Sequence, residues 1–283
     1  MKFARKYSVL EKRSLKTPIS VLLTQSLCED AGPLRPDAER FAQDDSCDEL
    51  TICTTPSTST ADKHEIIQSK YWAQRQRFFS LWDHGVRMDH TAWYSVTPEA
   101  LSRHHALRCT RAVPWEFTNP EKRNTLTILD ACCGVGGNTI QFAAKGFNVI
   151  AFDNRIDTLE LARCNSEIYQ VANHVHFICG DIVQNLSRVR TDVIFLSPPW
   201  GGPSYLNQQH RLTDIQLSDL NGIQLVECAL QLTPNVAYYL PRNIDLSDLL
   251  RLGTSFEVEK NYLNGKLKAI TVYFGTLMQL NAL

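Results

Sequence analysis

The chain has 283 residues, which is long enough for one large α/β domain with an extension. Its content of 43% hydrophobic and 21% charged residues excludes a chain that is disordered throughout. The formal net charge of -1 excludes a globally basic protein, so any contact with nucleic acid has to come from a local patch.

The cysteines and the first residues of the chain exclude further classes. None of the nine cysteines forms a C-x-x-C pair, so we expect no zinc or other metal site. The one apolar run near the start, residues 19–23, is too short for a signal-peptide core or a membrane span. We therefore expect an intracellular protein with reduced thiols and no membrane segment. A transit peptide in the Lys/Arg-rich start stays open as an alternative.

The N-terminal part of the chain falls into two segments. Residues 1–62 predict a flexible arm, because residues 29–62 contain nine acidic and two basic residues and little apolar periodicity. Residues 63–120 predict a helical extension that contributes to the active site, with aromatic side chains at helical spacing. Within it, we expect Thr97 to cap a helix that has Pro98 in its first turn.

Residues 121–283 predict the core domain. Short β-rich runs alternate there with helical segments, which indicates a parallel sheet covered by helices on both faces. Two last runs flank Asn264-Gly265, a strong signal for an antiparallel hairpin. This mostly parallel seven-stranded sheet with a terminal hairpin resembles the Rossmann-like class I fold of S-adenosylmethionine-dependent methyltransferases. The expected strands are residues 125–130, 148–153, 174–179, 191–196, 235–240, 255–263 and 267–275.

A glycine-rich turn follows the first of these strands. Gly134, Gly136 and Gly137 let the backbone pass close to a ligand. Asp153 ends the next strand, where a carboxylate can accept hydrogen bonds from both hydroxyls of a ribose. The pattern favours an adenosine-containing cofactor, and a tight turn without a ligand stays open as the alternative.

Two further carboxylates help to choose the cofactor. A dinucleotide-binding turn would need glycine at Thr139 and would put Asp130 beside a pyrophosphate, where the charges repel. We instead expect Asp130 near the ammonium group of a methionine moiety, which indicates S-adenosylmethionine. Asp181, after the third strand, can accept a hydrogen bond from the adenine amine, or it can cap a helix.

The fourth strand leads directly into Ser197-Pro198-Pro199-Trp200. Consecutive prolines fix φ and remove two N–H donors, so this loop offers oxygen acceptors. Ser197 Oγ and the Pro198 carbonyl are candidates to hold an exocyclic amine in line with a methyl donor. Trp200 can stack on the base, and a positively charged 7-methylguanine would gain about 0.5–2 kcal/mol from the cation–π contact. A rigid turn with a core tryptophan is the structural alternative.

Longer motifs make the resemblance specific. The SPPW loop is similar to the Asp/Asn-Pro-Pro-aromatic loop of amino methyltransferases that act on nucleic acids. Together with DACCGVGGNTIQFA, FICGD and KYWAQRQRFFSLWDHGVRMDHTAWYSVTPE, it makes the chain closely resemble the trimethylguanosine synthase family, from about Lys70 to near the C-terminus. The resemblance implies two successive methyl transfers to the 2-amino group of a 7-methylguanosine cap on small nuclear and nucleolar RNAs, giving 2,2,7-trimethylguanosine.

The same resemblance implies roles for individual residues. Trp200 would stack on the base, Ser197 and Pro198 would face its amine, and Asp153 would hold the cofactor ribose. The remaining implied cofactor residues are Asp130, Asp181 and Thr97, with Phe79 either closing the pocket or serving as a core aromatic. The implied residues around the cap phosphates are Lys70, Tyr205, Arg242 and Lys266 or Lys268.

Partners, location and two departures also follow from the resemblance. It implies 7-methylguanosine-capped RNA and Sm-type proteins of small nuclear ribonucleoproteins as partners. It also implies a nuclear location, in the nucleolus or Cajal-type bodies, with the cytoplasm as a further site. The family usually has an aromatic residue at the position of Cys132, and Asp-Pro shortly after the position of Asp153, where this chain has Asn154-Arg155. These departures concern the affinity for the cofactor rather than the reaction.

Two rival functions stay open. One is an amino methyltransferase that acts on another RNA or DNA base. The other is a cap-binding protein that has lost catalysis, which the intact glycine turn, Asp153 and Ser197 disfavour.

Overall fold

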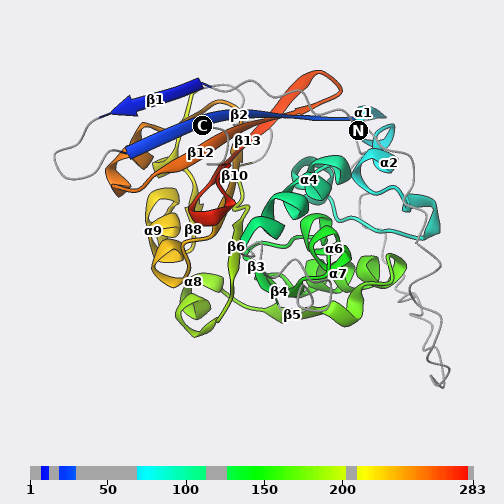
Figure 1. Cartoon of the computed structure of the whole chain (residues 1–283). Coiled ribbons are helices and arrows are strands. Elements are labelled where there is room, and N and C mark those ends of the chain that lie inside the picture. The colour runs from blue at the N-terminus through cyan, green and yellow to red at the C-terminus, as the bar shows by residue number, and fades with distance from the viewer. Residues whose placement is uncertain (1–7, 13–18, 30–68, 113–125, 202–208, 280–283) are drawn as a thin grey trace.

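The computed structural model describes residues 8–12, 19–29, 69–112, 126–201 and 209–279. Its centre is a nine-stranded sheet with the order β1-β2-β12-β13-β10-β6-β3-β4-β5 (Figure 1). Five neighbouring strands, from β10 to β5, run parallel, and β13 runs antiparallel between β10 and β12. The bounds of the seven strands that the sequence predicts are β3 Thr127–Asp130, β4 Asn148–Asp153, β5 Val175–Cys179, β6 Val193–Leu196, β10 Val236–Pro241, β12 Phe256–Leu263 and β13 Lys266–Tyr273.

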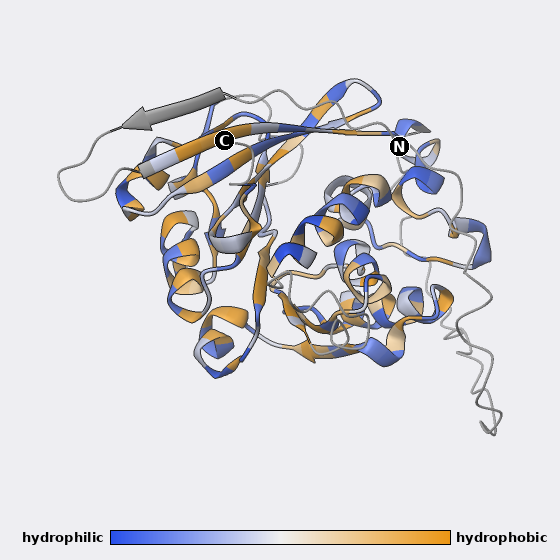
Figure 2. Ribbon diagram, viewed as in Figure 1, coloured by the Kyte–Doolittle hydropathy of each residue, from blue (hydrophilic) through white to orange (hydrophobic). Residues whose placement is uncertain are grey.

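Helices cover both faces of the sheet, as the alternating pattern predicts (Figure 1). On one face, α4 (Glu99–Cys109), α6 (Gly137–Ala144) and α7 (Ile156–Ile168) enclose one hydrophobic core with the strands. On the other face, α8 (Ile182–Asn185) and α9 (Gly222–Leu232) enclose a second core. Figure 2 shows the hydrophobic residues concentrated along the central strands and along α8 and α9.

The expectation of a flexible arm over residues 1–62 is wrong for its first part. Ile19–Cys28 forms β2, which pairs in parallel with β12, and Ser8–Lys12 forms β1 against it. The run ISVLLTQSLC has the β-branched and apolar composition of a strand, and β12 offers it an edge to pair with. Two of its polar side chains, Thr24 and Ser26, are buried against polar groups of β12. The rest of the expected arm, residues 30–62, lies outside the described residues.

The predicted helical extension is present as short elements. They are α1 (Ser69–Trp72), α2 (Arg75–Phe78), a 3₁₀ turn at Trp82–His84, α3 (Ala92–Ser95), α4 and a 3₁₀ turn at Thr110–Ala112. Thr97 does not cap α4, because that helix begins at Glu99 after Pro98 and its N-cap makes no side-chain hydrogen bond. The Thr97 hydroxyl instead accepts a hydrogen bond from Asn138, which is described below.

Small elements complete the fold around the sheet. Two pairs of very short strands are β7 His210–Arg211 with β11 Ile244–Asp245, and β8 Gln216–Leu217 with β9 Leu220–Asn221. The remaining 3₁₀ turns among the described residues are Ala172–His174, Leu186–Arg188, Leu212–Asp214, Ser247–Leu252 and Gly275–Leu277. No helix in the described part of the chain is long and apolar enough to cross a membrane.

A buried cluster of charged side chains connects α4 with the antiparallel strands β12 and β13. The Arg108 guanidinium donates to Glu257 Oε2 at 2.8 Å and to Glu259 Oε2 at 2.5 Å, and it lies 3.8 Å from the centre of the Tyr273 ring. Burial opposes ionisation of Glu259, but His104 and Arg108 hold its pKa at about 2. The positive charge of Arg108 compensates the carboxylates of Glu257 and Glu259, which would be costly to bury without a cation.

Candidate functional site

One cavity opens at the carboxyl ends of β3, β4, β5 and β6, and its volume is about 400 Å³. This size lies within the range of about 300–1,000 Å³ that is typical of small-molecule sites. The carboxyl ends of parallel strands are also where open α/β sheets bind ligands. The cavity is lined by Asp89–Ala92, Tyr94–Thr97, Ala131–Val135, Gly137, Asn138, Asp153–Arg155, Thr158, Gly180–Ile182, Ser197–Trp200, Leu217, Ser218 and Tyr239.

The glycine-rich turn after β3 forms the floor of this cavity. Gly134 and Gly136 have φ values of +52° and +93°, which side chains other than glycine rarely adopt. A Cβ atom on Gly137 would lie 2.8 Å from Val96 Cγ2, so glycine is needed there for close packing against the helical extension. The turn therefore has the shape that the sequence predicts, and it leaves backbone exposed to a ligand.

Asp153 fixes the position of this turn. Its Oδ2 accepts a hydrogen bond from the Gly134 N–H at 3.0 Å, and its Oδ1 accepts one from the Arg155 N–H at 3.0 Å. The residue ends β4 and lines the cavity, and its side chain is partly exposed. The carboxylate retains lone pairs for a ligand, so the structure places it where hydroxyl groups of a ribose can be bound.

Asp130 is fully buried at the end of β3. The Thr139 hydroxyl donates to its Oδ2 at 2.6 Å, and no described residue donates a hydrogen bond to its Oδ1. Burial raises the pKa of Asp130 to about 7. A buried carboxylate oxygen without a partner is costly, but Asp130 does not itself line the cavity, so its contact with the ammonium group of a ligand stays a prediction.

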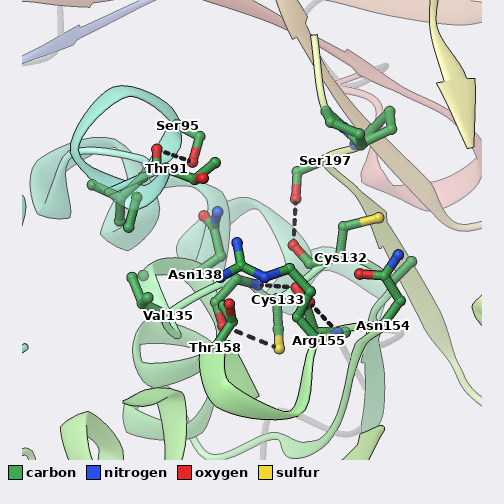
Figure 3. A pocket seen from close by; sticks show the side chains of 18 of the residues that line it. Thr91, Ser95, Cys132, Cys133, Val135, Asn138, Asn154, Arg155, Thr158 and Ser197 are labelled. Carbon is green, nitrogen blue, oxygen red and sulfur yellow. Dashed lines mark hydrogen bonds between the residues drawn. The ribbon is translucent and has the colours of Figure 1, made fainter. Parts of the chain in front are cut away.

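Ser197 connects the loop after β6 with the loop after β3. Its hydroxyl donates to the Cys132 carbonyl at 3.2 Å (Figure 3). A serine hydroxyl has one hydrogen and two lone pairs, so this bond leaves Ser197 Oγ as an acceptor toward the cavity. The same loop brings Pro198 and Pro199 to the cavity wall. The acceptor-only loop that the sequence predicts is thus positioned beside the glycine turn.

Trp200 lines the cavity and is partly buried, and it also packs against the hydrophobic core, so its role in stacking on a base stays a prediction. Its ring centre lies 5.1 Å from that of Tyr239 at an interplanar angle of 47°. Tyr239 belongs to β10 and is buried, and it supports the indole from behind. Gly201, the next residue, has a φ of +84°. The indole is held by the sheet and is available to a ligand.

The wall opposite Ser197 comes from the helical extension, and apart from Thr97 its residues were not predicted. Asp89 Oδ1 accepts a hydrogen bond from the N–H of Ala92, the first residue of α3, at 2.7 Å, and Asp89 Oδ2 accepts one from the Thr158 hydroxyl at 2.9 Å. The same Oδ2 forms an ion pair with Arg155 Nη2 at 3.0 Å. Figure 3 shows Thr91 and Ser95 on this wall, across from Ser197. The spacing from Asp89 to Ala92 is a helix-start signal that could have identified Asp89.

Asn138 and Thr97 connect the cavity to the protein interior. Asn138 Nδ2 donates to Thr97 Oγ1 at 2.9 Å, and its Oδ1 lies 3.1 Å from His105 Nδ1. The other ring nitrogen of His105 lies 3.1 Å from Thr271 Oγ1 of β13. Burial lowers the pKa of His105 to about 3, so the ring is neutral and orients Asn138 without adding charge.

The structure separates some of the predicted residues from the cavity. Phe79 is 1% exposed, packs near Tyr169 and does not line the cavity, so the expectation that it closes the pocket is wrong and its alternative as a core aromatic holds. Asp181 lines the cavity and also caps α8, accepting from the Val183 N–H at 2.9 Å. Its contact with an adenine amine stays a prediction.

The predicted phosphate ligands lie outside the cavity wall. Arg242 and Lys266 are exposed, and Lys268 is partly exposed. Arg242 follows the carboxyl end of β10 and donates to the Leu267 carbonyl at 3.3 Å, so it lies beside the start of β13. Lys70 is exposed in α1, and Tyr205 lies outside the described residues. The three cations at β10 and β13 share the sheet edge that carries the cavity, and their role stays a prediction.

No group of three or more His, Cys, Asp or Glu side chains within the described ranges could hold a metal ion. The described cysteines are free, and burial raises the pKa values of the Cys132 and Cys133 thiols, so neither is a reactive thiolate. The chemistry of the cavity therefore depends on carboxylate, hydroxyl, carbonyl and aromatic groups.

The chain is similar to known proteins over most of its length. A family model described as "RNA cap guanine-N2 methyltransferase" matches residues 125–277. The trimethylguanosine synthase of Schizosaccharomyces pombe is 37% identical over 217 residues, which cover 72% of this chain and 84% of that protein. The trimethylguanosine synthase of Saccharomyces cerevisiae is 34% identical over 219 residues, which cover 73% of this chain and 67% of that protein.

The solved structures support the fold. The crystal structure of a putative methyltransferase from Porphyromonas gingivalis W83 matches with a TM-score of 0.51 at 16% identity, covering 74% of this chain and 49% of that one. This likeness shows the Rossmann-like class I methyltransferase fold that the sequence predicts, and nothing about the substrate.

Proposed function

This chain belongs to the family of RNA cap guanine-N2 methyltransferases, and from that premise we propose how its cavity binds the cofactor and the cap. The protein is an enzyme that methylates the 2-amino group of the cap guanosine and uses S-adenosylmethionine as its cofactor. The product that we propose is the 2,2,7-trimethylguanosine cap, formed by two successive transfers. The names of the two yeast relatives support this product.

The residues at and directly behind the cavity floor fit S-adenosylmethionine. The partly exposed carboxylate of Asp153 suits ribose hydroxyls, and we assign the ammonium group to Asp130, which is buried directly before the lining residue Ala131 and has an unpartnered Oδ1. The turn at Gly134 leaves room for a ligand close to the backbone. When bound, the cofactor supplies an electrophilic methyl group on a sulfonium ion.

The loop after β6 binds and orients the base. The lone pair of a guanine 2-amino group is conjugated into the ring, so the amine must be held in a defined position before it can attack. Ser197 Oγ and the Pro198 carbonyl accept its hydrogens, and Trp200 stacks on the ring. A base methylated at N7 is positively charged, so the indole favours it over plain guanine by a cation–π contact.

One observation carries this proposal. Ser197 donates its only hydrogen to the Cys132 carbonyl, so in one cavity an acceptor-only hydroxyl faces the same space as a supported indole and the glycine turn. An amine donor and a cationic ring match these two groups, and a carbonyl or phosphate substrate would not. No strong base is needed, because the leaving group is a neutral thioether and the proton can leave after the transfer.

For the biological substrate, we propose small nuclear and small nucleolar RNAs with 7-methylguanosine caps. We further propose a nuclear location, in the nucleolus or Cajal-type bodies, with the cytoplasm as a further site, and Sm-type proteins as partners. The support for these three proposals is the resemblance to the trimethylguanosine synthase family.

A methylation assay with three RNAs tests the proposed function. The protein is incubated with labelled S-adenosylmethionine and an RNA that carries a 7-methylguanosine cap, an unmethylated guanosine cap or no cap. We expect labelling of the first RNA alone, and mass spectrometry of its cap should find both added methyl groups on N2. Equal labelling of all three RNAs would instead favour an amino methyltransferase for another base. Binding of a cap analogue without any cofactor binding, measured by calorimetry, would favour a catalytically silent cap-binding protein.

A further inference from the structure

The surface of α1 and α2 lies directly beside the cavity. Tyr94, which lines the cavity, contacts Tyr71 of α1 edge-on, with ring centres 4.7 Å apart. The next residue, Trp72, is 49% exposed, although it is one of the largest apolar side chains in the protein. The exposed indole of Trp72 is therefore next in sequence to a residue, Tyr71, that contacts the cavity wall.

Trp72 is held rigidly although half of it faces solvent. Its ring lies 5.8 Å from that of Trp82, nearly perpendicular to it, and 5.7 Å from that of Trp93. The guanidinium of Arg75 lies 5.1 Å from the Trp72 ring centre, and Arg75 Nη1 donates to the Trp72 carbonyl at 3.3 Å. The guanidinium of Arg75 lies over one face of an indole that two further indoles hold in place, and such aromatic and cationic groups together form a platform for stacking.

The charge of this surface differs from that of the whole chain. Residues 69–78, SKYWAQRQRF, carry Lys70, Arg75 and Arg77 and no acidic residue, whereas the chain as a whole has a formal net charge of -1. Cationic side chains that alternate with aromatic rings are the arrangement that binds single-stranded nucleic acid without reading its sequence. The substrate of the adjoining cavity is the end of such a strand.

We propose that α1 and α2 bind the first nucleotides of the transcript that follow the cap. A base stacks on Trp72, and Arg75 and Arg77 bind the neighbouring phosphates. This inference rests on the proposed function, because it takes capped RNA as the substrate. It adds a second binding surface outside the cavity, which allows the enzyme to distinguish a capped transcript from a free cap nucleotide.

Binding measurements with two ligands test this inference. One ligand is the free cap nucleotide 7-methylguanosine triphosphate, which has no transcribed nucleotide, and the other is an RNA of about ten nucleotides with a 7-methylguanosine cap. The wild-type protein should bind the capped RNA more tightly than the free cap nucleotide. Trp72→Ala should weaken binding of the capped RNA by about five- to 150-fold, as expected for a lost stacked base, and should leave the affinity for the free cap nucleotide unchanged.

Trp72→Ala also removes the packing of Trp72 against Trp82 and Trp93. Arg75→Glu is therefore a second variant, which leaves these ring contacts in place. Its expected effect is a loss of affinity for the capped RNA and a smaller slope of log affinity against log salt, by about 1 to 2. The matched control is Arg190→Glu, because Arg190 is an exposed arginine before β6, at the amino ends of the parallel strands. This variant should change the affinity for neither ligand.

Two results would overturn the inference. One is equal wild-type affinity for the free cap nucleotide and the capped RNA, and the other is an equal effect of Arg75→Glu on both ligands. These outcomes are distinct from failure of the proposed function, in which the wild-type protein would not methylate the capped RNA at all.

Discussion

Asp89 Oδ2 and Arg155 Nη2 lie 3.0 Å apart and join the helical extension to the core at the edge of the cofactor cavity. The contact also brings two cavity walls together, because the backbone N–H of Arg155 donates to Asp153. The ion pair is half exposed on the arginine side, and the aspartate has further partners.

The two members of this ion pair should therefore differ in their contribution to stability. Arg155→Ala should lower the free energy of unfolding by less than about 1 kcal/mol, because the guanidinium is 50% exposed and screened by solvent. Asp89→Ala should cost about 1–3 kcal/mol, because it also removes the acceptors for the Ala92 N–H at the start of α3 and for the Thr158 hydroxyl. Urea unfolding of both variants measures the difference. Equal losses would mean that the ion pair itself dominates.

Asp153 should be needed for cofactor affinity. Asp153→Ala removes the acceptor for the Gly134 N–H and the carboxylate that we assign to the ribose. We expect the dissociation constant for S-adenosylmethionine to rise by a factor that corresponds to about 1.5–3 kcal/mol, measured by calorimetry. Asp157→Ala is the control, because Asp157 is exposed in the first turn of α7 and does not line the cavity. An unchanged constant for Asp153→Ala would remove this residue from the cofactor site.

Asp130 should make the stability of the cofactor-free protein depend on pH. Burial raises its pKa to about 7, above the ordinary value of 3.8, so the folded protein keeps a proton that the unfolded chain releases. The contribution of Asp130 to stability should therefore fall as the pH rises from about 4 to about 7, by at most about 4 kcal/mol. Urea unfolding at several pH values should show a weaker fall for Asp130→Asn than for the wild type. Cofactor affinity should rise over the same window, because the carboxylate form binds an ammonium group.

Periodicity predicted the sheet well because the pattern of each core strand is local. Residues 125–130 and 191–196 became β3 and β6 almost without shift, and Asn264-Gly265 closes the hairpin as expected. The strand at Ile19–Cys28 was not predicted, because its partner on the core side, β12, follows it by more than 200 residues. Pairing over that distance leaves no mark in a short window, and the acidic stretch after it suggested an arm.

The site was predictable where chemistry depends on neighbours in sequence, as in the glycine turn and the Ser197–Trp200 loop. It was not predictable where distant residues meet. The ion pair of Asp89 with Arg155 joins segments that lie far apart in the chain, so no short stretch of sequence contains both partners. Phe79 shows the converse, because an aromatic residue at helical spacing suits both a pocket and a core, and only packing decides between them.

Arg108 should be essential for stability although it lies outside the cavity. It is 2% exposed and neutralises Glu257 and Glu259, which are themselves fully buried. Arg108→Met fills a similar volume but leaves two buried carboxylates without their cation, so we expect a loss of about 3–5 kcal/mol. Denaturant unfolding measures the loss. Adding Glu257→Gln and Glu259→Gln to the Arg108→Met variant should recover part of it, and no recovery would show that the charges are not the cause.

Trp200 should be required for methylation of the cap but not for binding of the cofactor. The indole rests on Tyr239 and faces the cavity, so its loss removes the stacking surface for the base and leaves the glycine turn and Asp153 in place. We expect Trp200→Ala to abolish methylation of a capped RNA and to leave the dissociation constant for S-adenosylmethionine unchanged. Trp200→Phe keeps a ring with a weaker attraction for cations, so it should retain some activity and lose part of the preference for a 7-methylated over a plain guanosine cap. Undiminished activity of Trp200→Ala on a capped RNA would show that another group holds the base, because stacking is the role that we propose for this side chain in the transfer.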